Sequence, residues 1–213
     1  MTAPDTPAPD CALCPRLTAF RTDNSAAYPD FHNAPVPSFG PLDARLLVVG
    51  LAPGLKGANR TGRPFTGDAA GDLLYPSLTD AGFAEGVYDR RPDDGLRLRD
   101  CRITNAVRCV PPQNKVTGAE AASCRPFLIS EIGAMRELKV LLALGRVAHE
   151  AVLRTFDLKL KDHAFAHGAV HDLPNGLRLA DSFHCSRYNV NTGRLTPEMF
   201  ADVLASVRSL LDR

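Results

Sequence analysis

Short apolar runs alternate along the chain with stretches in which apolar residues recur at helical spacing. The runs predict four buried strands, at Leu46–Leu51, Cys101–Cys109, Val140–Gly145 and Leu177–Phe183. The helical spacing predicts helices over residues 71–81, 117–137, 147–156 and 196–211. Because strands and helices alternate, we expect an α/β fold, a three-layer α/β/α sandwich around a mostly parallel sheet of about four strands.

Two of the predicted helices begin with recognisable capping signals. Thr117-Gly-Ala-Glu120 has the spacing of a capping box. Thr196 is a favoured N-cap residue, and Pro197 follows it at the first helical position.

The N-terminal segment shows no comparable periodicity. Residues 1–10 are rich in proline and aspartate, which predicts disorder. Residues 11–41 are expected to form an extended wrap, with little regular structure from Arg21 to Pro41. The chain has 213 residues and shows neither an internal repeat nor a clear linker, so we expect a single domain over residues 1–213.

Composition indicates the compartment. No apolar run approaches the roughly 18 residues of a membrane span, and the first residues lack the apolar segment of a secretory signal. We therefore expect a cytoplasmic protein with no membrane association. No obligate protein partner is evident, and a monomer is the default.

The net charge of +1 does not by itself indicate a nucleic-acid-binding protein. Basic residues do gather in three loops: Lys56, Arg60 and Arg63; Arg102, Arg108 and Lys115; Arg187 and Arg194. Loops after parallel strands meet at the carboxyl edge of the sheet, where ligands bind. We expect residues 50–68, 105–115 and 184–194 to converge there and to form a basic face; the alternative is that these side chains are merely solvated.

Four cysteines predict a metal centre. Cys11 and Cys14 form a C-x-x-C pair, and Cys109 and Cys124 are separated by fourteen residues. In a reducing compartment such a group favours metal ligation over disulfides. The second pair is too open for a usual zinc knuckle, so we favour a [4Fe–4S] cluster over zinc. The remaining Cys101 and Cys185 are interpreted as packing residues, although Cys185 lies beside His184.

Several motifs together resemble those of the family 5 (B-type) uracil-DNA glycosylases, which contain an iron–sulfur cluster. The motifs occur in the family's order from Cys11 to the final helix: Gly50-Leu-Ala-Pro-Gly54 followed by residues 59–68, then residues 104–112, 144–149 and 184–195. Leu51 stands where the related family 4 has an acidic residue, which favours family 5. Cys185 and Tyr188 depart from the Pro and Gln that many members carry.

The resemblance implies a pocket for a base flipped out of the DNA stack. Phe65 would stack on the base, the backbone near Ala52 and Gly54 would line the pocket, and Asn105 would hydrogen-bond the edge of the pyrimidine. Each has a plainer alternative, with Phe65 as a core residue and Asn105 as a turn residue.

The resemblance also assigns catalytic roles to two further residues, beside Asn105. His184 would donate to uracil O2 as negative charge develops there. Asp68 would orient a water molecule or stabilise positive charge on the sugar. The alternatives are a structural histidine at a strand end and an aspartate that caps the following helix.

The loops of the predicted basic face would bind DNA. Lys56, Arg60 and Arg63 would contact phosphates. A second set, Ser186, Arg187 and Tyr188, would enter the minor groove and fill the space left by the flipped base.

The resemblance therefore implies a monofunctional DNA glycosylase of base excision repair that removes uracil from double-stranded DNA. Hypoxanthine and xanthine are further candidate substrates. The cofactor would be a [4Fe–4S] cluster with a structural role. The alternatives are an iron–sulfur redox or sensing protein, a nucleotide-binding enzyme using the Gly50–Gly54 turn, and a non-catalytic module that binds damaged DNA.

Overall fold

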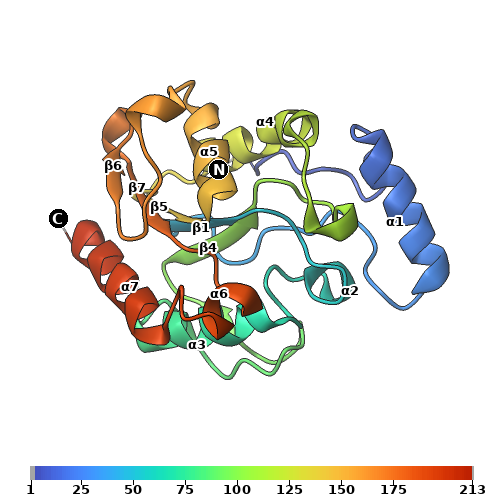
Figure 1. The fold of residues 1–213 in the computed structure, drawn as a ribbon, viewed down its shortest axis with the longest axis horizontal. Helices are drawn as coiled ribbons and strands as arrows, with labels where there is room; N and C mark the ends of the chain where they lie inside the picture. Colours follow the sequence, from blue (N-terminus) through green and yellow to red (C-terminus); the bar gives the residue numbers. More distant parts are fainter. Residues whose placement is uncertain (1–2, 213) are drawn as a thin grey trace.

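A computed structural model describes residues 3–212 and contains a five-stranded central sheet between two helical layers (Figure 1). The strand order is β4-β1-β5-β7-β6. The first four strands pair in parallel: β1 (Leu46–Gly50), β4 (Cys101–Asn105), β5 (Val140–Leu144) and β7 (Arg178–Ser182). The predicted α/β fold with a mostly parallel sheet is confirmed, with five strands in place of about four.

Helices cover both faces of the sheet, which is why its central strands are apolar along their whole length. Every residue of β1 and β5 is buried. The helices of one layer are α3 (Ala69–Asp80) and α7 (Pro197–Leu211), and those of the other are α4 (Gly118–Ala134) and α5 (Arg146–Thr155). Thr117 and Glu120 form the predicted capping box of α4, and the Thr196 side chain caps α7.

The fifth strand, β6 (Val170–Asp172), runs antiparallel to β7 at the edge of the sheet. It is too short to show an alternation of apolar and polar residues, and its outer two residues are exposed. Pairing with β7 therefore determines this strand, and the local sequence gives no signal for it. A separate two-stranded ribbon, β2 (Ala84–Glu85) with β3 (Arg97–Leu98), was missed for the same reason.

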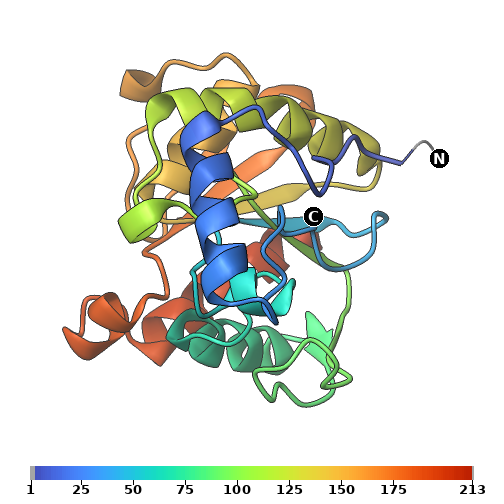
Figure 2. The ribbon, with the colours of Figure 1, turned by 90° about the vertical axis from the view of Figure 1, so that its right-hand side faces the viewer.

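Helix α1 (Pro15–Ala27) corrects the expectation of an extended wrap over residues 11–41. Its buried residues are Leu17, Arg21 and Asn24, so the buried face has no apolar stripe that would reveal a helix. Figure 1 shows α1 to one side of the sheet, and in the turned view of Figure 2 this helix lies in front. The predicted disorder of residues 1–10 falls in part on Met1 and Thr2, which lie outside the described residues. Farther along this arm, the backbone N–H of Asp5 donates to Ser130 Oγ of α4.

The remaining elements are short. They are α2 (Ala58–Thr61), α6 (Arg187–Asn191) and the 3-10 helices Pro112–Asn114, Leu160–Asp162 and Pro174–Gly176. None of the helices within residues 3–212 combines the length and the apolar character needed to cross a membrane.

The core predicts a large effect of truncating a central side chain. Leu142 of β5 is fully buried between Val48 and Ala180 of the neighbouring strands. Leu142→Ala should lower the free energy of unfolding by about 2–5 kcal/mol, because it removes buried methyl groups and leaves a cavity. Urea denaturation measures this. Val87→Ala, at a residue that is 74% exposed, should change stability by less than about 0.5 kcal/mol. Equal effects of the two substitutions would contradict the packing described.

Candidate active site

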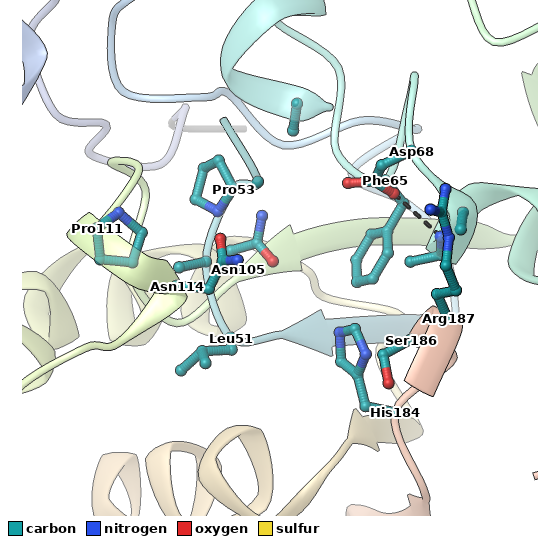
Figure 3. A pocket seen from close by; sticks show the side chains of 15 residues that line it. Leu51, Pro53, Phe65, Asp68, Asn105, Pro111, Asn114, His184, Ser186 and Arg187 are labelled. Atoms are coloured by element: carbon teal, nitrogen blue, oxygen red, sulfur yellow. Dashed lines mark hydrogen bonds between the residues drawn. The ribbon is translucent and has the colours of Figure 1, made fainter. Parts of the chain in front are cut away.

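A cavity of about 400 Å³ lies beyond the carboxyl ends of β1, β4 and β7 (Figure 3). Three stretches of chain line it: residues 51–70 after β1, residues 105–114 at and after β4, and residues 184–187 after β7. The structure thus brings together the three loops that were expected to converge. Ala52, Gly54, Phe65, Asp68, Asn105, His184, Ser186 and Arg187 all line this cavity.

Asn105 ends β4 directly beside Gly50, the last residue of β1. Its side chain is only 3% exposed, and Oδ1 has no hydrogen-bond partner within residues 3–212. A Cβ at position 50 would lie 2.4 Å from Asn105 Oδ1 and 2.5 Å from Phe65 Cζ. Glycine at position 50 therefore provides the space in which the amide and the aromatic ring reach the cavity.

Phe65 and His184 face the same cavity from opposite loops, with ring centroids 5.9 Å apart (Figure 3). Phe65 has φ of +52°, a left-handed conformation that is unfavourable for a residue with a side chain. Such strain is found where the surrounding structure imposes it, and often at functional sites. In this protein, hydrogen bonds from neighbouring tyrosines impose the conformation of Phe65.

Two tyrosines hold the backbone around Phe65. The Tyr88 hydroxyl donates to the carbonyl oxygen of Phe65 and accepts from the N–H of Gly67, both at 3.2 Å. The Tyr75 hydroxyl donates to the carbonyl oxygen of Pro64 at 2.6 Å. The conformation of the loop at Phe65 is therefore held from two sides.

A buried ion pair supports these tyrosines and corrects the prediction for Arg63. The side chains of Arg63 and Asp94 are 5% and 1% exposed and form two hydrogen bonds of 2.8 and 2.7 Å. The guanidinium lies over the rings of Tyr75, Tyr88 and Phe39. Arg63 is thus buried beneath the loop and is not available to a DNA phosphate. Sequence alone did not reveal this role, because Asp94 lies 31 residues away.

Burial alone would raise the pKa of Asp94, but hydrogen bonds outweigh that effect. Arg63 and the backbone N–H groups of Asp89 and Leu96 donate to the carboxylate and hold its pKa well below the usual range. Asp94 therefore stays ionised opposite Arg63.

Asp68 caps α3, which was the alternative to a catalytic role, and its side chain also lines the cavity. Its Oδ1 accepts from the N–H of Ala70 at 3.1 Å. Its Oδ2 faces the turn before α2, where a Cβ would lie 2.1 Å away at Gly57 and 3.0 Å away at Gly54. Capping and a role in the cavity are compatible, because they use different oxygens.

His184 is partly buried, and its backbone carbonyl accepts from Asn189 Nδ2 at 2.8 Å. Burial lowers the pKa of its imidazole, and the negative charge of Asp68 opposes this effect without reversing it. At neutral pH the ring is therefore uncharged, and a neutral imidazole donates one hydrogen bond.

The remaining residues predicted to contact DNA lie in the loops that form the cavity, and two of them, Ser186 and Arg187, line it. Lys56, Arg60 and Arg187 are exposed, and Tyr188 is 70% exposed. Ser186 caps the short helix α6 by accepting from the N–H of Asn189. Sequence analysis did not identify Pro111 and Asn114, which line the opposite side of the cavity from Arg187 (Figure 3).

Comparison with known proteins decides the family. Residues 37–208 match the model of the uracil DNA glycosylase superfamily. A type-5 uracil-DNA glycosylase of Thermus thermophilus is 47% identical over 205 residues, 94% of this chain and 93% of the relative. The chain belongs to the type-5 uracil-DNA glycosylases. Two others, from Pyrobaculum aerophilum and Mycobacterium leprae, are 43% and 41% identical over 92% and 94% of this chain and over 86% and 91% of the relatives. The suspected family is confirmed.

The four predicted cysteine ligands of this type-5 glycosylase line one small hollow. Cys11 and Cys14 come from the N-terminal segment, Cys109 follows β4, and Cys124 belongs to α4. All four thiols are free of disulfides. Arg21 Nη1 lies 3.5 Å from Cys109 Sγ, and Nη2 donates to the carbonyl oxygen of Cys11.

The spacing of the four cysteine sulfurs fits a metal cluster better than a single metal ion. Thiolates around one zinc lie within about 4 Å of one another, given Zn–S bonds of about 2.3 Å. In the described chain, no three of the four cysteine sulfurs come within 4.8 Å of one another. A four-iron cluster spreads its four thiolate ligands over different irons. Burial raises the pKa of the Cys109 thiol to about 11, so a metal group that binds there must displace its proton.

The buried ion pair of the glycosylase gives a stability prediction. Asp94→Ala should cost about 3–5 kcal/mol, because it leaves the Arg63 guanidinium buried without its partner. Glu85→Ala removes an exposed ion pair with Arg99 and should cost about 1 kcal/mol or less. Chemical denaturation of both variants makes the comparison. A cost for Asp94→Ala as small as that of the control would show that the pair does not support the loop.

The lowered pKa of His184 predicts a pH dependence of stability. The unfolded chain binds a proton at this residue near pH 6.5, whereas the folded chain does so only at lower pH. The stability contribution of His184 is therefore constant above about pH 7 and falls as the pH drops below 6.5. We expect His184→Gln to gain stability relative to the parent protein on going from pH 8 to pH 5. Thermal unfolding at both pH values measures this, and a difference that does not change with pH would contradict the shift.

Proposed function

We propose that this uracil-DNA glycosylase of base excision repair, acting in the cytoplasm, hydrolyses the N-glycosidic bond of a uracil flipped out of double-stranded DNA and leaves an abasic site. The observation that carries the proposal is the buried Oδ1 of Asn105, which lines the cavity without a protein partner. A buried acceptor left unpaired costs about 1–3 kcal/mol. The N3–H of a bound uracil would satisfy it.

The unpaired oxygen of Asn105 also indicates which bases the cavity accepts. Uracil presents an N–H donor beside a carbonyl oxygen, which matches the acceptor and donor of the Asn105 amide. Cytosine presents an acceptor at the same ring position and would leave Oδ1 unpaired. Hypoxanthine and xanthine repeat the uracil pattern on their six-membered ring, and a cavity of about 400 Å³ has room for a purine. We include both as substrates.

Phe65 and His184 would act on the bound base. The aromatic ring offers a stacking surface on the cavity wall. The neutral His184 imidazole would donate to uracil O2, where negative charge develops as the glycosidic bond breaks. A donor of this kind contributes about 3 kcal/mol, or roughly 100-fold in rate.

Asp68 would act on the sugar side. Because its Oδ1 is held by the N–H of Ala70, its Oδ2 has a defined direction towards the Gly54–Gly57 turn. From there the carboxylate would orient a water molecule or stabilise positive charge on the sugar. Within residues 3–212, no lysine lines the cavity to form a covalent intermediate with the sugar, which favours a monofunctional glycosylase.

The exposed residues of the loops around the cavity would contact DNA. Lys56, Arg60 and Arg187 would bind phosphates, so affinity should fall as salt concentration rises. Tyr188 and Ser186 would fill the space that the flipped base leaves in the duplex. We expect the protein to act as a monomer.

We propose that Cys11, Cys14, Cys109 and Cys124 hold a [4Fe–4S] cluster. When bound, the cluster would cross-link the N-terminal segment, the loop after β4, and α4. Apolar side chains, including Leu17, Val107 and Phe127, surround the hollow and would shield the cluster from water.

Release of uracil from a duplex with one U opposite G, followed by alkali to reveal abasic sites, tests the reaction. Strand breaks should appear only after alkali. Asn105→Ala and His184→Gln should each lower the rate about 100-fold or more, and Asp68→Asn by about 10²–10⁴-fold. The matched control is Asp72→Asn, because Asp72 is in the same helix but pairs with Arg90 outside the cavity.

Three results would contradict this mechanism. Breaks before alkali would show that the enzyme cuts the backbone, and full activity of the variants would remove their assigned roles. Tight binding to the uracil duplex without base release would favour a non-catalytic module.

Serine substitutions test the cluster. Cys109→Ser should lose the brown colour and most of the bound iron, because it removes one of the four proposed ligands. Cys101→Ser and Cys185→Ser are the matched controls, because these buried cysteines lie outside the hollow, and both should keep about four irons per chain. Equal iron in all three variants would refute the ligand assignment.

A further inference from the structure

Three polar side chains form a buried cluster beside the sheet, outside the Asn105 cavity. Asp181 is in β7, His149 in α5 and His171 in β6. Their side chains are 0%, 2% and 14% exposed. One nitrogen or oxygen atom from each lies within 4.8 Å of the others.

The hydrogen bonds determine where the protons are. His149 Nε2 lies 2.9 Å from the carbonyl oxygen of His163, which can only accept, so Nε2 carries a proton. A neutral imidazole carries one ring proton, and its other nitrogen is then an acceptor. His149 Nδ1 is 2.8 Å from Asp181 Oδ1, so two acceptors would face each other. Either a proton, on the ring or on the carboxyl group, or a metal ion must therefore bridge the two atoms.

We propose that this cluster binds a zinc ion through His149 Nδ1, His171 Nε2 and the Asp181 carboxylate, with water in the fourth position. Imidazole nitrogen and carboxylate oxygen are ordinary zinc ligands. The bond from His149 Nε2 to a backbone carbonyl is the usual outer contact that orients a zinc-binding histidine.

The present distances are close to those that zinc requires. A tetrahedral zinc with bonds of about 2.0–2.2 Å holds neighbouring ligand atoms about 3.3–3.5 Å apart. His149 Nδ1 and His171 Nε2 lie 2.8 and 3.1 Å from the two oxygens of Asp181. Side-chain rotations that widen these gaps by about 0.2–0.7 Å, and that bring the two ring nitrogens, now within 4.8 Å of each other, to the same spacing, would complete the site.

The zinc would be structural. It would link β6, β7 and α5, and two of these elements, α5 and β6, flank residues 156–169. That segment supplies Phe165 and His167 to a second hollow whose wall includes His184, and His167 Nδ1 accepts from the N–H of Phe183. Zinc would thus stabilise the segment that supports one side of His184.

Counting metals in the holoprotein tests the site. Protein purified without a metal-affinity tag is incubated with zinc and desalted, and zinc and iron per chain are measured together by mass spectrometry. Only samples of equal, full iron content are compared, because cysteines without a cluster also bind zinc. The variant is His171→Asn, and the matched control is His32→Asn, at a histidine that contacts the Pro35 carbonyl and lies outside the cluster.

The parent protein and His32→Asn should each hold about one zinc more than His171→Asn, and zinc should raise the melting temperature of only those two. Equal zinc in all three proteins would overturn the proposal. So would a parent protein with full iron and no zinc, and that result is decisive even if His171→Asn does not fold. In that case a proton on His149 Nδ1 or on Asp181 bridges the two groups.

Discussion

The parallel pairing of β1 with β4 sets the geometry on which the candidate active site depends. It places Gly50 beside Asn105 at the ends of the two strands. Because position 50 has no side chain, the Asn105 amide and the Phe65 ring occupy the space next to it. A shift of register by one residue would turn the Asn105 side chain to the other face of the sheet, away from the cavity. Base recognition in our account is therefore a consequence of strand pairing.

The loop after β1 shows how an unfavourable conformation is maintained. Phe65 has a positive φ that would cost of the order of 1 kcal/mol or more in an isolated chain. Hydrogen bonds from Tyr88 and Tyr75 hold the adjacent carbonyl groups, and the Arg63–Asp94 pair packs beneath both tyrosines. The support is buried, whereas the basic residues Lys56 and Arg60 of the same loop are exposed. One set of residues therefore positions the loop, and a different set is available to contact DNA.

Much of this arrangement was visible in the sequence, because the signals are local. Apolar runs showed the four parallel strands, and capping residues showed the starts of α4 and α7. The loops after β1, β4 and β7 were expected to meet, since parallel strands end at one edge. The motifs at residues 50–68, 104–112, 144–149 and 184–195 together resemble those of the family 5 uracil-DNA glycosylases, and the comparisons confirm that family.

The features that were missed depend on contacts between distant segments. Helix α1 buries mainly polar side chains, and β6 exists through its pairing with β7. Arg63 lies in a basic loop, which suggested a contact with phosphate. Its buried pairing with Asp94, 31 positions away, could not be seen in the local sequence. The cluster of His149, His171 and Asp181 likewise joins three elements that no local motif connects.

The most direct test of the account is a structure of the protein bound to its reaction products, a duplex with an abasic site and free uracil. We expect the uracil ring to lie against Phe65, with N3–H donating to Asn105 Oδ1 and O2 accepting from His184. A base bound outside this cavity, or an Asn105 Oδ1 that bonds to a protein group in place of the base, would contradict the proposed mode of recognition.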